Sequence, residues 1–266
     1  MSFAISGKTA IVTGGANGIG LAIGRHFLAK GVNVIFADMD EENLLKELGP
    51  NEDGKSHRYF AGDLREKLTL ANLLSATLDA FDSVDILVNA SRQIITSDPM
   101  HADDAMEVML RQNLLTPLRL SQLVAKRMIK QAEGGDKKGN LGAIVNLSCI
   151  ASRRTTPDLL AYSVASAALD QMTRSLAVAL APNGIRVNGL AFGSVMSNSL
   201  KDTLREHSDY RSEIEKHTPM GRLAAPTELT EAAQFLASEA SGFMTGQILT
   251  VDGGRTLVDA VSAPAH

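Results

Sequence analysis

The segment TGGANGIG, residues 13–20, constrains the fold of this chain more than any other feature. It directly follows an apolar run, KTAIVT (8–13), and leads into a helical pattern over 18–30. The glycines that fall where the backbone must turn tightly or approach a ligand are Gly14, Gly18 and Gly20. A helix that begins there directs free N–H groups and the positive end of its dipole towards an anion. We therefore expect a strand–turn–helix unit that binds phosphate.

Asp38 sharpens this expectation, because it follows the next apolar run (32–37), 18 residues beyond Gly20. A carboxylate at that place accepts hydrogen bonds from the ribose hydroxyls of an adenosine and repels a 2′-phosphate. The glycine loop also carries Asn17 and Ile19 but no basic residue that would bind an extra phosphate. The sequence thus predicts NAD as cofactor, with NADP disfavoured.

Short apolar runs alternate with helical patterns along the chain. We predict strands at 8–13, 32–37, 57–61, 84–89, 142–149, 185–192 and 247–251, and helices at 18–30, 41–48, 65–81, 102–110, 114–131 and 161–181. Continuous apolar strands in β-α alternation indicate a parallel sheet covered by helices on both faces. We expect an α/β fold with a doubly wound parallel sheet of about seven strands, formed by residues 1–266 as a single domain.

Three segments fall outside this alternation. Residues 133–140 are a polar turn, and residues 193–226 form the one long irregular stretch, with a helix near 198–206. Long loops in compact domains are usually functional, so we expect 193–226 to cover the substrate. The tail, 255–266, is small and polar enough to fray.

Composition excludes several classes of function. A net charge of −4 favours neither a nucleic acid nor an anionic membrane surface as partner. The apolar runs are about strand length, far below the roughly 20 residues that span a bilayer, and the N-terminus has no signal-peptide pattern. Cys149 is the single cysteine, so no internal disulfide forms. We expect a cytoplasmic protein, and no pattern indicates a metal site.

Several motifs together resemble the short-chain dehydrogenase/reductase family over residues 7–254: TGGANGIG, AD at 37–38, DL at 63–64, VN at 88–89, Asn113, Tyr162, IRVNGLAFG and TGQILTVDGG. The resemblance implies a Rossmann fold and hydride transfer between a nicotinamide and a small alcohol or carbonyl substrate. It also implies a homo-oligomer, commonly a tetramer built through the long helices and the C-terminal strand.

The resemblance extends to cofactor-binding positions. It places Asp63 and Leu64 at the adenine and Asn89 in the cofactor cleft. It places the segment after Gly193 over the nicotinamide and the substrate.

The family's catalytic positions are only partly kept. Tyr162 matches the tyrosine that exchanges a proton with the substrate oxygen, and Asn113 matches the asparagine that positions a relay water. The family serine lies 13 residues before the tyrosine, and that position is Cys149, next to Ser148. The family lysine lies four residues after the tyrosine, and that position is Ser166. On the residues alone, Tyr162 also fits a packing role and Asn113 a polar helix surface.

The serine position leaves two interpretations open. A thiol is a weaker donor than a hydroxyl, so Cys149 either orients a carbonyl poorly or is a small buried hydrophobe. Ser148 points to the opposite face of an extended strand, so it replaces Cys149 only if the strand bulges or has ended. Covalent thiol chemistry would need a base and a positive environment.

The lysine position changes the electrostatics. Ser166 lies on the same helix face as Tyr162 and is able to bond a ribose hydroxyl, but it carries no charge. An ordinary tyrosine has a pKa of about 10, and a nearby cation lowers an acid's pKa by roughly 1–3 units. Loss of this cation slows oxidation more than reduction, because reduction uses the protonated tyrosine.

Two further departures fall in the same cleft. In NASR, residues 89–92, Arg92 stands where the family has glycine, and Phe192 stands where it has proline, which fits a packing exchange. Arg92, Arg153 and Arg154 either bind an anionic substrate through bidentate contacts, restore part of the missing positive field, or are solvated loop residues.

Three functions follow from these observations. The first is an NAD-dependent oxidoreductase with an atypical site. The second is a non-catalytic NAD-binding regulatory protein or the inactive subunit of a mixed oligomer. The third, a structural protein that no longer binds NAD, is disfavoured by the intact glycine loop and Asp38.

Overall fold

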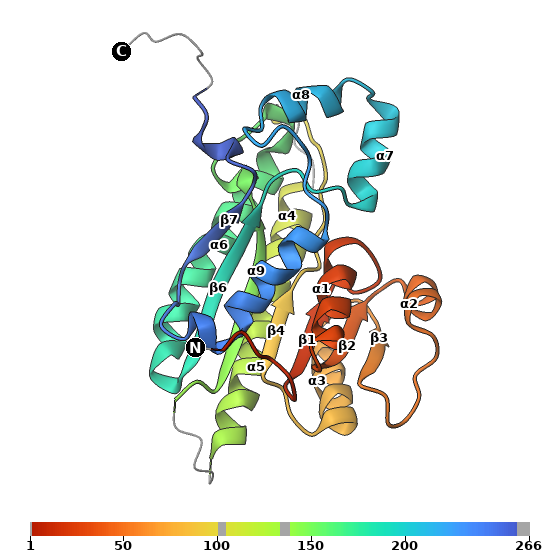
Figure 1. Ribbon diagram of the computed structural model, residues 1–266, viewed down its shortest axis with the longest axis vertical. Helices are drawn as coiled ribbons and strands as arrows, with labels where there is room; N and C mark the ends of the chain where they lie inside the picture. Colours follow the sequence, from red (N-terminus) through yellow and green to blue (C-terminus); the bar gives the residue numbers. More distant parts are fainter. Residues whose placement is uncertain (1, 101–104, 134–138, 260–266) are drawn as a thin grey trace.

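A parallel sheet forms the centre of the computed structural model, which describes residues 2–100, 105–133 and 139–259. Within these ranges the seven strands run in the order β3-β2-β1-β4-β5-β6-β7, and every neighbouring pair is parallel (Figure 1). The strands are β1 (Thr9–Thr13), β2 (Asn33–Asp38), β3 (His57–Ala61), β4 (Ile86–Asn89), β5 (Gly142–Cys149), β6 (Ile185–Phe192) and β7 (Ile248–Val251). The predicted doubly wound α/β fold is confirmed.

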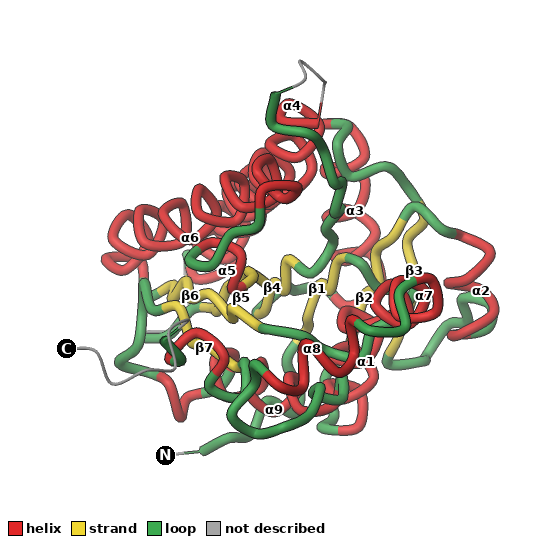
Figure 2. Tube along the Cα trace, turned by 90° about the horizontal axis from the view of Figure 1, so that it is seen from above, coloured by secondary structure: helices red, strands yellow, loops and turns green. Residues whose placement is uncertain are grey.

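Helices cover both faces of the sheet (Figure 2). One face carries α1 (Gly18–Ala29), α2 (Glu41–Leu48) and α9 (Thr227–Ala237), and the other carries α3 (Lys67–Phe81), α5 (Thr116–Ala132) and α6 (Leu160–Leu180). The first core layer is built around Phe27 and Phe36, and the second around Leu73 and Leu120. Because side chains of a strand alternate between faces, each buried strand contributes to both layers. None of the described helices is long and apolar enough to cross a membrane.

Helices also occupy the segment predicted to be irregular. Within 193–226 the structure places α7 (Asn198–Glu206), as expected, and α8 (Tyr210–Lys216), which was not expected. Helix α9 was missed as well, although Pro226 at its N-cap and Glu228 in its first turn are start signals. The helix predicted at 102–110 corresponds to α4 (Ala105–Leu110). Residues 102–104 of that prediction, 134–138 of the polar turn and 260–266 of the tail lie outside the described residues.

The strands β1 and β4 are paired at the centre of the sheet, and the chain adds strands in one direction up to β3 and in the other direction from β4 onwards. In doubly wound sheets, ligands bind at such a switch point, at the carboxyl ends of the strands. Predicted site residues from five strands or their following loops meet at this edge: Gly14, Asp38, Asn89, Cys149 and Gly193. The topology therefore brings together residues that are far apart in the sequence.

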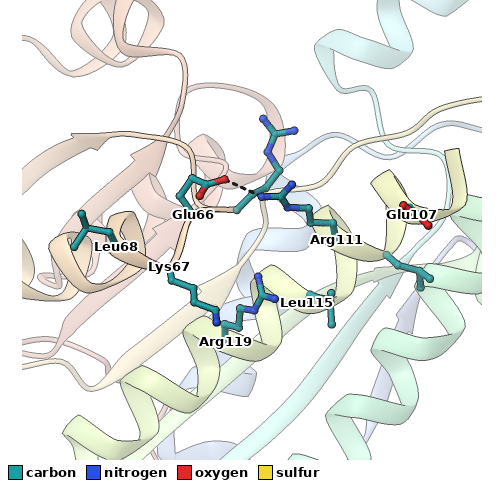
Figure 3. A pocket seen from close by; sticks show the side chains of 9 residues that line it. Glu66, Lys67, Leu68, Glu107, Arg111, Leu115 and Arg119 are labelled. Carbon is teal, nitrogen blue, oxygen red and sulfur yellow. Dashed lines mark hydrogen bonds and ion pairs between the residues drawn. The ribbon is translucent and has the colours of Figure 1, made fainter. Parts of the chain in front are cut away.

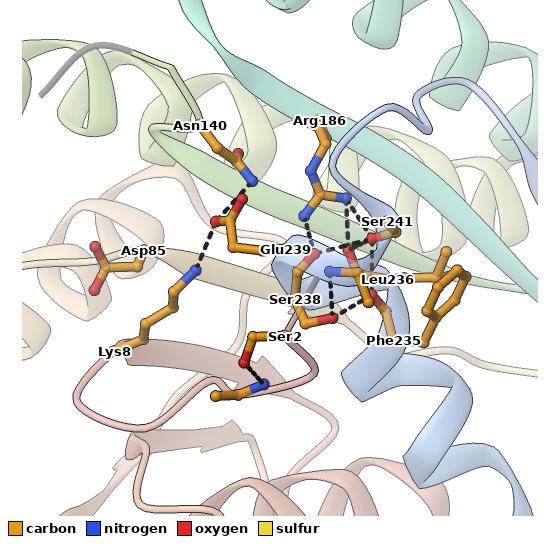
Figure 4. Close-up of polar contacts among 12 residues, drawn as sticks. Ser2, Lys8, Asp85, Asn140, Arg186, Phe235, Leu236, Ser238, Glu239 and Ser241 are labelled. Atoms are coloured by element: carbon orange, nitrogen blue, oxygen red, sulfur yellow. Dashed lines mark hydrogen bonds and ion pairs between the residues drawn. The ribbon is translucent and has the colours of Figure 1, made fainter.

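A buried arginine ties α9 to the sheet (Figure 4). Arg186 on β6 is only 6% exposed, and its Nη1 donates to the Leu236 carbonyl and to Ser241 Oγ, both at 2.8 Å. Its Nη2 donates to the Ser238 carbonyl at 3.0 Å. Burial lowers the pKa of this guanidinium, whereas the charge of Glu239 raises it. The side chain thus pairs the carbonyls that the end of α9 leaves without helical partners.

We predict that Arg186→Met lowers the free energy of unfolding by about 2–4 kcal/mol, because the carbonyls at the end of α9 lose buried partners. Chemical denaturation measures this loss. Arg174→Met is the matched control: Arg174 is exposed on α6, and its removal should stay within about 0.5 kcal/mol. Equal stability of the two variants would contradict the assigned role of Arg186.

Candidate active site

The glycine loop is shaped for a ligand that approaches the backbone. Gly14 and Gly18 have φ of 67° and 55°, values that favour glycine. A Cβ on Gly14 would come within 2.9 Å of the Ala90 carbonyl oxygen, whereas the nearest atom to a Cβ on Gly18 is 4.0 Å away. A Cβ on Gly20 would overlap the Gly14 carbonyl. The loop therefore packs tightly against residues 90–91 and stays open above Gly18.

The start of α1 leaves this open side ready for an anion. Asn17 at the N-cap is extended and makes no side-chain cap bond, and the first turn holds no acidic residue. The amides of that turn therefore remain for a phosphate. Beside them, Asp38 Oδ2 accepts from the Ala16 amide at 3.1 Å, and Oδ1 accepts from the Met39 amide at 2.8 Å. Ile19 lies buried behind the loop. These residues fit a dinucleotide with its ribose at Asp38.

Asp63, which is predicted to contact the adenine, is bonded to Arg65. Asp63 accepts two bonds from Arg65 Nε and one from Arg65 Nη2, the last at 2.6 Å. The Arg65 guanidinium holds the pKa of the Asp63 carboxyl below its ordinary value. Leu64 is buried in the core layer under α3. The contact of Asp63 and Leu64 with adenine stays a prediction.

Residues 90–93, which follow β4, are anchored from both sides. Thr13 Oγ1 accepts from the Ala90 and Ser91 amides, each at 3.0 Å. On the other side, Asn113 forms a reciprocal pair with the Gln93 backbone: Oδ1 accepts from its amide at 2.9 Å, and Nδ2 donates to its carbonyl at 2.8 Å. Asn113 lies in a single π-helical turn, Arg111–Leu115, an insertion common at functional sites. This loop, called here the 90–93 loop, is therefore held in one position.

The anchored loop directs Arg92 at the predicted proton donor. Arg92 Nη1 donates to the Tyr162 hydroxyl oxygen at 2.9 Å. The guanidinium carbon also stands 4.3 Å from the centre of the Phe192 ring, a cation–π distance. Phe192 is 2% exposed and pairs in register with Cys149. Two of the departures from the family pattern therefore meet at Tyr162 and act on one another.

Tyr162 itself is buried, with 3% exposure. Burial raises the pKa of its phenol well above the ordinary value of 10, because the charged form loses its hydration. Arg92 acts in the opposite direction, and Cys149 raises the pKa further. At neutral pH the hydroxyl is therefore protonated and in contact with a cation.

Ser166 does not occupy the position of a lysine head group. Its Oγ donates to the Tyr162 carbonyl oxygen at 2.7 Å, one turn back along α6. Such a bond is common for serine inside a helix. The side chain is 4% exposed, so the structure does not direct its hydroxyl at a ribose. The cation that contacts the Tyr162 hydroxyl in this structure is Arg92, from the loop after β4.

Ser148 and Cys149 both lie near Tyr162 at the end of β5. Ser148 is 3% exposed, and its Oγ has no partner among the described residues. Cys149 is half-buried, and it packs with Tyr162 in a small cluster under α4. Asn89 Nδ2 donates to Ser121 Oγ at 3.0 Å and Asn146 Oδ1 at 2.8 Å, beneath the site.

A small cavity of about 10 Å³ connects these groups. Its polar lining residues are Asn89, Ser91, Arg92, Asn113, Ser148, Tyr162 and Ser166. That volume is about the minimum for one water molecule. Among the described residues, no group of three or more His, Cys, Asp or Glu side chains is placed to hold a metal ion.

A larger hollow, of about 660 Å³, lies between the start of α3 and the α4–α5 region (Figure 3). Glu66 and Arg111 pair across it at 2.8 Å, and Arg119 also lines it. It shares no lining residue with the cavity at Tyr162. The smaller cavity, and not the larger hollow, therefore contains the residues predicted to be catalytic.

The other two arginines of the predicted cluster point elsewhere. Arg153 Nη1 donates to Thr250 Oγ1 at 3.3 Å, and Arg154 Nη2 donates to the Thr256 carbonyl. Both thus contact β7 and the segment that follows it, and neither is bonded to Arg92. A Cβ on Gly193 would come 2.9 Å from Asp252 Cβ, so that glycine allows β6 to pass the same segment.

The fold and this cleft define a class of protein, a Rossmann-type α/β protein with a buried tyrosine held against an arginine. A family model described as enoyl-(acyl carrier protein) reductase matches residues 14–256. An uncharacterised oxidoreductase of Thermotoga maritima is 33% identical over 257 residues, which cover 95% of this chain and 97% of that protein. The chain belongs to the short-chain dehydrogenase/reductase family, whose members are oxidoreductases that use NAD(P).

Two similar proteins carry more specific names. The cis-4-hydroxycyclohexanecarboxylate dehydrogenase of Sinomonas cyclohexanicum is 32% identical over 260 residues, covering 97% of this chain and all of that protein. A solved gluconate 5-dehydrogenase of Burkholderia cenocepacia, in complex with NADP and tartrate, superimposes with a TM-score of 0.85 at 29% identity. That superposition covers 97% of this chain and 98% of the other.

We predict that Asn113→Ala frees the 90–93 loop, so hydrogen exchange at the Gln93 amide becomes at least about tenfold faster. Gln131→Ala is the matched control, because Gln131 pairs in the same reciprocal way with the Val84 backbone, at 2.9 and 3.0 Å. It should speed exchange at Val84 and leave Gln93 unchanged. Slow exchange at Gln93 in Asn113→Ala would show that other contacts hold the loop.

Proposed function

We propose that this protein is an NAD-dependent oxidoreductase that interconverts a small alcohol and its carbonyl compound. Tyr162 exchanges the proton with the substrate oxygen, and Arg92 is the cation that stabilises the phenol oxygen. The observation that supports this most directly is the 2.9 Å bond from Arg92 Nη1 to the Tyr162 oxygen. A positive charge at that distance stabilises the tyrosinate that remains after the proton has left.

Each residue of the cleft has a separate role in this reaction. When bound at the glycine loop, the nicotinamide cofactor supplies or accepts the hydride. During reduction Tyr162 donates its proton to the carbonyl oxygen, and Arg92 holds the resulting negative charge. Asn113 keeps Arg92 in place through the Gln93 backbone. Ser148 Oγ, buried and unpartnered in the described part of the chain, is available for a water or for the substrate oxygen.

The raised pKa of Tyr162 favours reduction at neutral pH. The phenol is then protonated, which is the form that donates. Oxidation needs the tyrosinate. While the pH stays below the pKa of Tyr162, the tyrosinate fraction increases about tenfold for each unit by which the pH rises.

We therefore expect reduction to be flat between about pH 6 and 9, and oxidation to climb steadily across that range. Tyr162→Phe should lower both rates by about 10²- to 10⁴-fold. Steady-state rates with NADH or NAD and a panel of ketones and alcohols test this. An oxidation profile that levels off near neutral pH, or full activity in Tyr162→Phe, would contradict the assignment.

A second function, cofactor binding without turnover, is favoured by two observations. The lysine position is a serine bonded within its own helix, and the phenol is deeply buried. Under that alternative the native protein is inactive, and the double variant Cys149→Ser/Ser166→Lys gains activity by orders of magnitude. Fast native turnover excludes this alternative.

We propose NAD as the cofactor in preference to NADP, because the Asp38 carboxylate stands beside the glycine loop and the exposed Met39 follows it. We expect NADH to raise the thermal unfolding midpoint more than NADPH at equal concentration. In Asp38→Ala the two cofactors should become similar, because the repulsion of the 2′-phosphate is lost. A native protein that prefers NADPH would overturn this, and no shift with either would overturn both functions above.

We also propose a homotetramer. Helix α6 exposes Leu160, Val164 and Val178, the last at 77%, and β7 is an edge strand beside the fully exposed Phe243. Apolar side chains of this kind on a helix face and next to a sheet edge fit contacts with further copies of the chain. Sedimentation should give a tetramer for the native protein and smaller species for Val178→Glu and Phe243→Glu. A native monomer would contradict the proposal.

The substrate is proposed to be a small, anionic alcohol or carbonyl compound. Two of the similar proteins are named for alcohols that carry a carboxylate. Arg92 supports the same choice, because this half-buried cation has no ion-pair partner in the part of the chain that the structure describes.

A further inference from the structure

We infer that the substrate is a 2-oxo acid, or the matching 2-hydroxy acid, and that Arg92 binds its carboxylate. The inference rests on the proposed function in one respect: it takes Tyr162 as the group that faces the reacting oxygen. It goes beyond it by fixing where the negative charge of the substrate lies, on the carbon next to the carbonyl.

The first observation is that most of the N–H donors of Arg92, and its charge, have no partner among the described residues. Among the described residues it makes no ion pair, and its one hydrogen bond goes to Tyr162. A guanidinium carries five N–H donors in one plane. The Phe192 ring lies against a face of that plane, 4.3 Å from the guanidinium carbon, so it leaves the N–H donors at the edge of the plane uncovered. A half-buried cation without a counter-charge stabilises an anion that enters beside it.

The second observation is distance. A carbonyl oxygen that receives the proton from Tyr162 lies about 2.7 Å from the phenol oxygen. Arg92 Nη1 is 2.9 Å from that same oxygen. In a 2-oxo acid the carbonyl and one carboxylate oxygen sit on adjacent carbons, about one hydrogen-bond length apart. Three hydrogen bonds of about 2.7–2.9 Å then form together: phenol to carbonyl oxygen, guanidinium to carboxylate oxygen, and guanidinium to phenol oxygen.

Other placements of the charge fit less well. Each extra carbon between carbonyl and carboxylate moves the charge by about 1.5 Å, so the three hydrogen bonds no longer form together. Arg153 and Arg154 bond Thr250 and the Thr256 carbonyl, and neither arginine lines the cavity at Tyr162. The charge nearest to Tyr162 therefore selects an acid group adjacent to the reacting carbon.

The third observation is that Arg92 is preorganised. The 90–93 loop is fixed by Thr13 at one end and by Asn113 at the other, and Gln112 Nε2 donates to Ser91 Oγ at 3.0 Å. A cation held in place before the ligand arrives loses little further freedom on binding. Such a support is expected for a residue that recognises a ligand, and is not needed for a solvated arginine.

The reaction balances with the groups named. In reduction the carbonyl carbon gains a hydride from the reduced nicotinamide and the oxygen gains the proton of Tyr162. The products are the 2-hydroxy acid, the oxidised cofactor and a tyrosinate, which takes a proton from solvent. The carboxylate stays bonded to Arg92 and takes no part in the electron transfer.

The test uses oxamate, an anionic mimic of a 2-oxo acid, and oxamide, its neutral counterpart. Calorimetric titration of the full chain, with and without saturating NADH, should show that oxamate binds at least about tenfold more tightly than oxamide. Arg92→Met should remove that preference, and Arg92→Lys should keep part of it. Arg153→Met, the matched control, should bind oxamate as the native protein does.

Equal binding of the two probes, or unchanged oxamate binding in Arg92→Met, would overturn the inference. Thermal unfolding and NADH binding verify that the Arg92→Met protein is folded. If Arg92→Met does not fold, oxamate binding by Arg92→Lys is compared with that of the native protein instead. Because the titration needs no turnover, the two proposals fail separately. If oxamate binds through Arg92 but no carbonyl compound is reduced, the proposed function is wrong and the 2-oxo acid site stands. Reduction of neutral ketones without oxamate binding sinks the 2-oxo acid alone.

Discussion

The fixed backbone of residues 90–93 is the constraint on which the cleft depends. Gly14 packs against it so closely that a Cβ would touch the Ala90 carbonyl, which couples the 90–93 loop to the glycine loop. Thr13 and Asn113 bond it from the two sides, and it carries Arg92 to the Tyr162 hydroxyl. One short segment thus packs against the glycine loop and also holds a positive charge beside the Tyr162 hydroxyl.

Electrostatic support depends on distance, not on where a charge originates in the chain. A lysine one helical turn after Tyr162 and an arginine 70 residues before it act alike if each places a cation against the phenol oxygen. The substitution of the lysine by Ser166 is therefore not equivalent to loss of the charge. What differs is the direction of approach, because Arg92 comes from the side of β4 and is able to contact a substrate as well.

Much of the fold could be predicted from the sequence, because each buried strand is a continuous apolar run bounded by glycine or polar residues. Helix α9 was missed although Pro226 and Glu228 announce it, and α8 has only seven residues. At the site, the glycine loop and Tyr162 were identified from motifs. The Arg92–Tyr162 bond, the π-helical turn at Asn113 and the separation of Arg153 from Arg92 depend on loop paths that no local pattern specifies.

The central claim is that Arg92 supplies the positive charge that the family obtains from its lysine. A double-mutant cycle in kcat for oxidation, with Arg92→Met and Ser166→Lys, tests it most directly, because oxidation requires the tyrosinate that a nearby cation stabilises. If the two cations are alternatives, Ser166→Lys should accelerate the Arg92→Met protein by at least about tenfold and the native protein by less than about threefold. An equal factor in the two backgrounds would show that Arg92 does not act on Tyr162 during catalysis, and would contradict the account.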